Sequence, residues 1–306
     1  MTITAEQRAM RAQGIGGSDA PIIAGVSPWK TPLALWMEKR GTTTEISEAN
    51  LPMKIGTALE SLILNEWAAQ TGREVTLQDS TLFALGNRTL FAHIDGQVKG
   101  CNEGIEAKWV GRPNAEWGDP DTDAVPAHVF IQCAHYLMVT GWNRWHVAAC
   151  MGGQDVRVYV IERNEAIIEH LRAMELEFWR KVQDGTPPDM QNAADARLRW
   201  PRDDGSQITA SPDVLEILAQ LQHVRNEARD YAVMQDKLEG EVQKYMGEAS
   251  TLVNAAGAVY ATWKLSKPSE RLDTKALRAA CPDVAQQFTI TAPGSRRFLL
   301  KTAKDN

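Results

Sequence analysis

Two carboxylates and a lysine stand at spacings that suit metal-dependent chemistry. Asp95 follows the apolar run Leu90–Ile94, and Glu106 and Lys108 lie within a second run, Gly104–Val110. Because alternate residues of a strand point to the same face, Glu106 and Lys108 are predicted to project side by side. An ammonium would then lie next to any cation that the carboxylates bind.

The residues between the two runs favour a turn, because glycine and asparagine readily adopt turn conformations. Those that carry this signal are Gly96, Gly100, Asn102 and Gly104. A hairpin is therefore predicted, with Asp95 and Glu106 facing each other. Two such carboxylates repel unless a cation lies between them. Oxygen ligands without a nearby His or Cys favour Mg²⁺, for which Mn²⁺ can substitute.

This set of groups suits phosphodiester hydrolysis. The reaction needs a deprotonated water and positive charge near the transition state, and a cation held by two carboxylates supplies both. Lys108 could lower the pKa of the attacking water or stabilise the non-bridging oxygens. The sequence contains no G-x-S-x-G, H-E-x-x-H or Walker motif, so serine hydrolase, zinc protease and ATP-driven helicase chemistry are disfavoured. A solvated sheet with an ordinary Glu-x-Lys pair is the alternative.

An anion-binding segment is predicted near the N-terminus. Arg11 precedes Gly16, Gly17, Ser18 and Asp19, and an apolar stretch follows. This pattern predicts a helix with Ser18 or Asp19 as its N-cap. Free backbone N–H groups and flexible glycines at that end could bind an anion, and Arg11 could add a bidentate contact. An ordinary capped helix with a surface arginine is the alternative.

Two further motifs follow before the carboxylates. Ser27-Pro28-Trp29-Lys30 predicts a rigid turn that carries an aromatic ring and a cation. Gly56-Thr-Ala-Leu-Glu60 is predicted to open a helix whose apolar positions are Leu59, Leu62, Ile63 and Trp67. Glu60 lies off the centre of that stripe, so it could reach a metal or simply complement the helix dipole.

The order of these motifs resembles the YqaJ-like viral recombinase family, which includes lambda exonuclease, within the PD-(D/E)XK nuclease superfamily. The resemblance covers roughly residues 8–165 and is carried by GIGGSDA, GVSPWK, GTALE, HIDG, IEAK and IQCAHYLMVTG. It implies an α/β fold with a restriction-endonuclease-like core, in which helices flank a mixed central sheet. A C-terminal α+β extension follows this core.

The resemblance also implies a role for each matched residue. The metal ligands would be Asp95, Glu106 and the backbone carbonyl of Ala107, and Lys108 would position or activate the attacking water. Gln132 matches the glutamine of the extended motif, and Glu60 matches a helical glutamate that borders the metal site. The pair that holds a terminal 5′-phosphate would be Arg11 and Ser18. His93 stands where a small residue is expected.

The activity implied is a Mg²⁺-dependent 5′→3′ exonuclease that acts on double-stranded DNA ends and leaves a 3′ overhang. The family also implies a ring-shaped homotrimer and a single-strand annealing protein as partner. One alternative is a structure-selective or restriction-type endonuclease, in which the Arg11 and Ser18 pocket would have no purpose. The other is a non-catalytic DNA-end-binding scaffold, which the combination of Asp95, Glu106 and Lys108 argues against.

Composition is that of an ordinary water-soluble protein, with 306 residues, 43% hydrophobic and 24% charged. No apolar run reaches the length of a membrane span and no signal peptide is recognisable, so a cytoplasmic location, in a bacterial host if phage-encoded, is expected. Four scattered cysteines show no metal-binding spacing and should be reduced thiols. With a net charge of −6, DNA binding would require a local basic patch.

Three segments are predicted along the chain: a nuclease domain at 1–185, a linker at 186–207, and a second unit at 208–306. The first contains helices at 126–141 and 164–183 and an antiparallel strand pair at 145–150 and 156–162. In the second, a long helix is predicted from Ser211 to about Gly247. A turn at 254–257 then joins one strand to another at 259–265. A helix at 273–281 and a final strand at 288–290 and 297–301 follow. This unit could serve oligomerisation, recruitment or DNA contact.

Most tryptophans of the first half should be buried, with one or two able to stack on a frayed base. Among them are Trp29, Trp36, Trp109, Trp117, Trp142 and Trp145.

Overall fold

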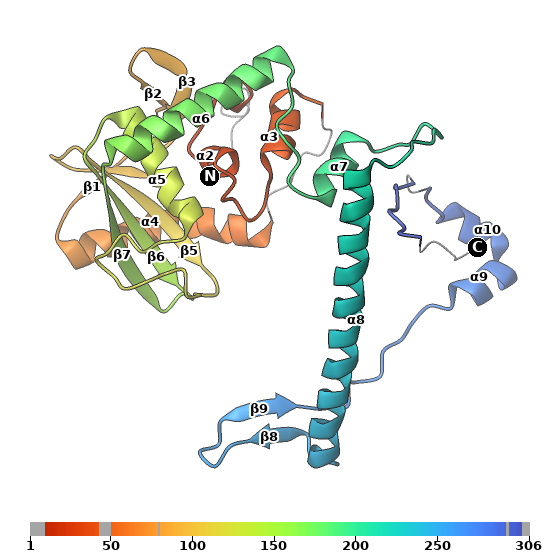
Figure 1. Cartoon of the computed structure of the whole chain (residues 1–306). Coiled ribbons are helices and arrows are strands. Elements are labelled where there is room, and N and C mark those ends of the chain that lie inside the picture. The colour runs from red at the N-terminus through yellow and green to blue at the C-terminus, as the bar shows by residue number, and fades with distance from the viewer. Residues whose placement is uncertain (1–9, 43–49, 79, 292–293, 302–306) are drawn as a thin grey trace. The chain divides into compact units, whose positions relative to one another are not determined.

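The computed structural model describes residues 10–42, 50–78, 80–291 and 294–301. The chain divides into two compact units between Arg199 and Trp200 (Figure 1). The segment predicted as a linker, 186–207, contains helix α7 (Ala193–Arg199). The hydroxyl of Thr31 donates to Oδ1 of Asp195 in this helix at 2.5 Å, which ties α7 to the first unit.

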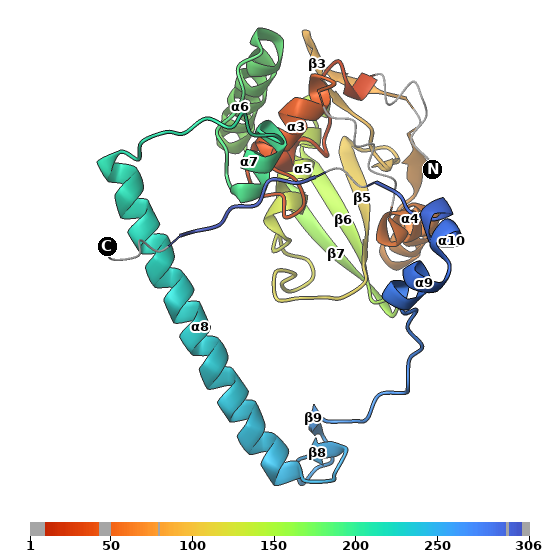
Figure 2. The same ribbon diagram turned by 90° about the vertical axis from the view of Figure 1, so that its right-hand side faces the viewer.

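A five-stranded mixed sheet forms the centre of the first unit (Figure 2). β5 and β6 are parallel, whereas every other neighbouring pair is antiparallel. The strands in spatial order are β1 (Val75–Leu77), β4 (Gly96–Val98), β5 (Glu103–Val110), β6 (Arg144–Met151) and β7 (Asp155–Glu162). The predicted mixed sheet and the predicted antiparallel pair across Gly152 and Gly153 are thus confirmed.

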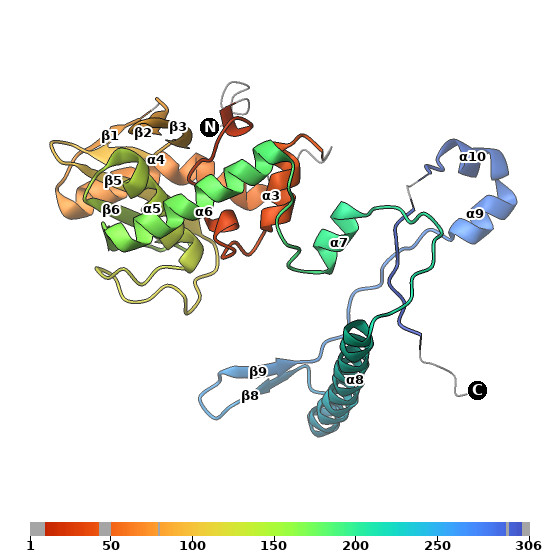
Figure 3. The ribbon, with the colours of Figure 1, turned by 45° about the horizontal axis from the view of Figure 1, so that its top comes forward.

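Helices cover both faces of this sheet (Figure 3). On one face, α4 (Leu51–Thr71) buries Ile63, Leu64 and Trp67 against the sheet. On the other, α5 (Ala127–Thr140) packs against β6 and is in turn covered by α6 (Glu165–Asp184). The α/β class with flanking helices, and the two helices expected at 126–141 and 164–183, are confirmed.

The hairpin opposite β5 is formed by a different strand from the one predicted. β3 (Asn87–Ala92) pairs with β2 (Leu82–Ala84) in a separate small sheet, and the strand opposite β5 is β4. Gly96, interpreted as a turn residue, begins β4 opposite Ile105. A β-carbon at position 96 would lie 2.5 Å from Cγ1 of Val75, so this glycine permits close strand packing rather than a turn.

Helix α4 begins earlier than the sequence indicated. Asn50 is its N-cap and accepts a hydrogen bond from the amide of Met53 at 3.0 Å. Gly56 and Glu60 therefore lie inside the helix instead of at its start, and Leu62 is exposed rather than part of the buried stripe. The preceding helices are α2 (Ala20–Ile23) and α3 (Pro32–Lys39).

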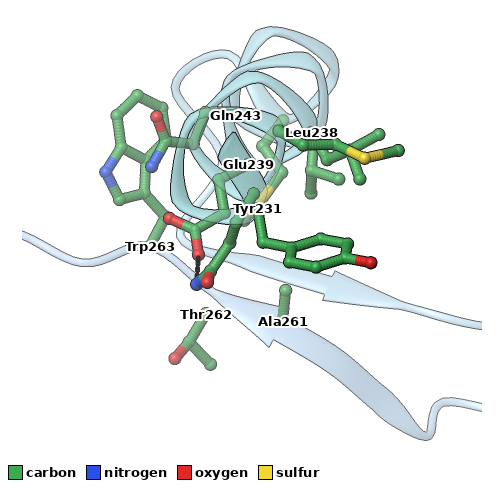
Figure 4. Close-up of a pocket in the computed structure, with 11 residues that line it drawn as sticks. Tyr231, Leu238, Glu239, Gln243, Ala261, Thr262 and Trp263 are labelled. Carbon is green, nitrogen blue, oxygen red and sulfur yellow. Dashed lines mark hydrogen bonds between the residues drawn. The ribbon is translucent and has the colours of Figure 1, made fainter. Parts of the chain in front are cut away.

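The second unit contains a long helix and a small hairpin. Its elements are α8 (Pro212–Met246), β8 (Thr251–Val253), β9 (Val259–Thr262), α9 (Thr274–Ala280) and α10 (Pro282–Gln287). Ser211 caps α8 and Asp273 caps α9, as expected. The predicted strand at 288–290 and 297–301 is wrong, because neither segment pairs with a neighbouring strand. Residues of α8 and β9 line an open apolar groove of about 570 Å³ (Figure 4).

None of the described helices has the length and hydrophobicity that a membrane span requires. All four cysteines are free thiols.

Candidate active site

Strand β5 presents a carboxylate and an ammonium group on the same face. Nζ of Lys108 lies 2.6 Å from Oε1 of Glu106, as the two-residue period of a strand predicts. Burial disfavours the charged form of Lys108, but the carboxylate of Glu106 outweighs it and raises the pKa of the ammonium group. Lys108 is therefore a stable cation in this site.

Asp95 lies immediately before β4, opposite the middle of β5. Its Oδ2 accepts a hydrogen bond of 2.8 Å from the backbone amide of Ala107, which fixes the carboxylate beside Glu106. Burial raises the pKa of Asp95 well above its ordinary value, and the carboxylates of Glu106 and Glu60 raise it further. Such a site strongly favours a cation between the carboxylates.

Helix α5 completes the network through Gln132. Its carbonyl oxygen accepts from Nζ of Lys108 at 2.9 Å, and its amide donates to Oε1 of Glu106 at 3.0 Å. The same amide nitrogen donates to the hydroxyl of Tyr136 at 2.7 Å. Tyr136 was not predicted, although its position four residues after Gln132 places it on the same helix face.

The donor set fits a hard divalent cation. Oε2 of Glu106 is buried and has no hydrogen-bond partner among the described residues, so one ligand lone pair is uncommitted. Asp95 supplies a second carboxylate, and both offer oxygen, as Mg²⁺ prefers. Within the described part of the chain, no group of three or more His, Cys, Asp or Glu side chains is arranged to hold a metal. A cation here would therefore need backbone or water oxygens as well.

Glu60 borders this network without joining it. It is half-buried on α4, and burial raises the pKa of its carboxyl, as does the charge of Glu106 to a smaller extent. The electrostatic coupling to Glu106 and Asp95 places Glu60 near the site. No hydrogen bond joins it to the other described residues of the network.

Arg11 and Ser18 are brought together as the sequence suggested. Nη2 of Arg11 donates a hydrogen bond to the hydroxyl of Ser18. The charge of Arg11 also reaches His93: burial lowers the pKa of this histidine, and Arg11 lowers it further. His93, the residue not expected at this position, therefore lies near Arg11. Its Nε2 also forms a hydrogen bond with the hydroxyl of Thr81.

Asp19 occupies the predicted N-cap position, directly before α2, but its side chain makes no capping hydrogen bond. Asp19 is buried instead, and its Oδ2 accepts from the amide of Gly16 at 3.1 Å and from Nζ of Lys39 at 2.6 Å. The amide of Gly16 is thus already used. Gly17 is required for packing rather than flexibility, because a β-carbon there would lie 2.8 Å from Cζ of Tyr136.

Lys39 is a second residue that the sequence analysis missed. Its ammonium group is buried and binds the carbonyl oxygens of Arg11 at 2.5 Å and Gly14 at 2.8 Å, in addition to Asp19. These contacts fold the segment from Arg11 to Asp19 around one cation. Nothing in the local pattern identifies this role, because a lysine in the last turn of a helix is ordinary.

The chain is similar to one known protein family and to a protein of Bacillus subtilis. Residues 7–143 match the family described as YqaJ-like viral recombinase domain. The chain is also 28% identical over 286 residues to the uncharacterized protein YqaJ of Bacillus subtilis (strain 168), covering 90% of this chain and 88% of that protein. The similarity to that protein therefore extends into the second unit.

The solved structures that the chain matches include two exonucleases. An alkaline exonuclease from Laribacter hongkongensis, LHK-Exo, matches with a TM-score of 0.48 and 19% identity, over 60% of this chain and 94% of that one. A phage-related exonuclease from Haemophilus somnus 129PT matches with a TM-score of 0.45 and 13% identity, over 56% of this chain and 96% of that one.

Proposed function

We propose that this YqaJ-like chain is a nuclease that acts on DNA, and specifically a Mg²⁺-dependent 5′→3′ exonuclease. It would degrade one strand of linear double-stranded DNA and leave a 3′ overhang for recombination by strand annealing. The observation that carries the proposal is the single network of Asp95, Glu106, Lys108 and Gln132, with one buried carboxylate oxygen left for a cation.

Asp95, Glu106 and the carbonyl of Ala107 would hold Mg²⁺, or Mn²⁺ in its place. A cation bound there supplies Lewis acidity and lowers the pKa of water. The protein's part is to fix the two carboxylates before the cation arrives. The amide of Ala107 holds Asp95, and the amide of Gln132 holds Glu106.

Lys108 acts through its positive charge. Although burial opposes the charge, the neighbouring carboxylates of Glu106 and Asp95 raise the pKa of its ammonium group. As a hydrogen-bond donor, Lys108 can orient the attacking water or stabilise charge on the phosphate oxygens. Gln132 fixes the direction of this donor by accepting from it at 2.9 Å.

Arg11 and Ser18 would bind the terminal 5′-phosphate and so set the direction of digestion. A guanidinium and a hydroxyl already in contact provide donors for a phosphate dianion. Their segment packs on Tyr136, the residue that Gln132 contacts, so an end held by Arg11 would be close to the catalytic network.

Self-association is supported by the second unit. Ten positions of α8 follow one another at alternating spacings of three and four residues, and only one of them is polar. They are Val214, Ile217, Leu221, Val224, Ala228, Tyr231, Gln235, Leu238, Val242 and Tyr245. This is a coiled-coil repeat, and nearly all of these side chains are exposed.

A second copy of α8 is the occupant that this repeat fits best. It would present the same apolar series, and Gln235 would fix the register between the helices. We therefore propose a homo-oligomer, and the resemblance to the family favours a trimer. The same resemblance favours a single-strand annealing protein as partner and the cytoplasm of a bacterial host as location. Sedimentation at micromolar concentration would contradict self-association if the full chain were a monomer.

The direct test uses linear duplex DNA with either a 5′-phosphate or a 5′-hydroxyl, incubated with Mg²⁺, Mn²⁺ or EDTA. We expect digestion from 5′ ends, faster with the phosphate, and none in EDTA. Closed circular duplex serves as the control and should remain intact. Cleavage of the circle would identify an endonuclease instead. End binding without cleavage under any metal would identify a scaffold.

A further inference from the structure

The seven tryptophans of the first half have very different environments. Trp36, Trp67 and Trp145 are buried, and Trp109, Trp117 and Trp142 are partly buried against the core. Trp29 leaves 77% of its side chain exposed, the largest share among the ten tryptophans of the chain, all of which are described. An indole ring in water forgoes the hydrophobic stabilisation that burial would give. Packing therefore does not account for a tryptophan here.

The turn that carries Trp29 holds it in place. Pro28 restricts the backbone, and the amide of Trp29 donates to the hydroxyl of Ser27 at 3.3 Å. Lys30 forms an ion pair of 2.5 Å with Glu38 on α3, which anchors the other side of the turn. The exposed ring thus projects from a fixed base rather than from a long loop.

The Trp29 ring rests edge-on against His128. Their ring centroids are 4.9 Å apart with an interplanar angle of 82°. His128 lies in the first turn of α5, four residues before Gln132, so both side chains project from one face of the helix. The charge of Lys108 reaches His128: burial lowers the pKa of this histidine, and Lys108 lowers it further. Trp29 is therefore one helical turn away from the network of Glu106 and Lys108.

We propose that Trp29, supported by His128, is a stacking platform for an unpaired nucleobase of the DNA strand bound at the Asp95 and Glu106 centre. The ligand class is a nucleobase of any identity, because stacking uses the π face that all bases share. A platform one helical turn from the site would hold the strand while its terminal nucleotide is separated from the complementary strand. The inference rests on the proposed function for the substrate.

Binding experiments with cleavage prevented by EDTA test the platform. The probe is a linear duplex whose 5′-terminal nucleotides are unpaired, and its affinity is measured by fluorescence anisotropy. Trp29→Ala should weaken binding by about 5- to 150-fold, the range that loss of one stacked base implies. Trp29→Phe, which keeps an aromatic face, should remain close to wild type. Leu85→Ala removes another exposed apolar side chain, in the turn between β2 and β3, and should leave the affinity unchanged.

A second arm separates stacking from a structural effect. Abasic sites are placed at each unpaired position of the probe in turn. One of them should weaken binding to wild type but not to Trp29→Ala, because the variant has already lost the contact. Equal loss of affinity in wild type and Trp29→Ala at every position would overturn the inference. If wild type digests duplex DNA while Trp29→Ala binds the probe equally well, only the platform fails. If wild type neither digests nor binds DNA, the proposed function itself fails.

Discussion

The ring of Tyr136 fills the space where Gly17 would otherwise carry a side chain. A β-carbon at position 17 would lie 2.8 Å from Cζ of that ring and closer still to Cε1. The hydroxyl of Tyr136 accepts from Gln132, which in turn contacts Lys108 and Glu106. One aromatic residue thus joins the segment of Arg11 and Ser18 to the network on β5.

Gly17→Ala should therefore impair stability and cleavage together. The new methyl group must displace Tyr136, and overpacking of this kind destabilises a protein by about 1–3 kcal/mol. Urea unfolding and duplex digestion measure the two effects. Gly56→Ala is the matched control, because Gly56 lies inside α4 with nothing within 4 Å of its missing β-carbon. That variant should be more stable by about 0.5–1 kcal/mol. A Gly17→Ala protein with wild-type stability would contradict the packing argument.

Asp95→Ala and Glu106→Ala should each abolish cleavage and leave end binding largely intact. Loss of a carboxylate that holds the cation removes several kcal/mol of transition-state stabilisation, on the order of a thousandfold in rate or more. Calorimetry with Mn²⁺ should show weaker metal binding in both variants. Near wild-type digestion by either protein would end the assignment of this site.

Lys108→Ala should lower the cleavage rate by about 10²- to 10³-fold, the scale for removal of one charged donor from a transition state. Metal affinity should change little, because an ammonium group is not a ligand. Gln132→Ala should have a smaller effect in the same direction, since it only releases Lys108 and Glu106 from their orientation. A variant of Lys108 that lost metal binding as completely as Glu106→Ala would assign the lysine to the metal site.

Arg11→Ala should reduce the preference for phosphorylated ends. Hydrogen bonds to charged groups contribute about 1.5–3 kcal/mol, so digestion of 5′-phosphorylated duplex should slow by roughly 10- to 150-fold. The rate on 5′-hydroxyl duplex should change much less. Arg88→Ala, which removes an exposed arginine from β3, controls for general loss of positive charge. If Arg11→Ala lowers both rates equally, Arg11 does not recognise the 5′-phosphate.

A buried ion pair predicts how stability depends on pH. Nδ1 of His135 lies 2.8 Å from Oε1 of Glu175, and neither side chain is exposed. Burial opposes the charge on His135, but Glu175 and the carbonyl of Phe91 outweigh it and raise the pKa of the imidazole. A raised pKa contributes stability that is complete below the unfolded value of about 6.5 and is lost as pH rises through the folded value.

The free energy of unfolding should therefore decrease as pH rises above about 6.5. Glu175→Gln should remove most of this dependence and destabilise the protein by about 3–5 kcal/mol, because it breaks a buried pair. Thermal unfolding followed by circular dichroism at several pH values measures both effects. His170→Gln, at an exposed position on α6, should keep the wild-type profile. A flat wild-type profile would contradict the charged state of His135.

The sequence pattern correctly predicted those features that depend on residues close together in the chain. The two-residue strand period placed Glu106 and Lys108 together, and the capped helices α5, α6, α8 and α9 begin and end close to where the pattern indicates. These features depend on backbone geometry within a few residues, which sequence periodicity describes well. The resemblance to a family added Gln132 and the pairing of Arg11 with Ser18, which no spacing could supply.

The missed features depend on residues far apart in the chain. Lys39 binds carbonyl oxygens 25 and 28 residues earlier, and Tyr136 packs on Gly17. Asp19 holds the N-cap position that its residue type favours, yet its buried carboxylate binds Lys39 instead of capping the helix. Gly96 looked like a turn residue for the same reason, although its role is close packing against Val75.

The orientation of Asp95 by the amide of Ala107 makes this part of the site insensitive to most mutations at position 107. Every residue except proline carries the same N–H group, so a change of side chain cannot by itself remove the hydrogen bond. Selection at position 107 would then act through side-chain volume, because the methyl group packs against the core beneath α4. We therefore expect packing rather than chemistry to limit the residues tolerated at position 107, even though it lies between Glu106 and Lys108.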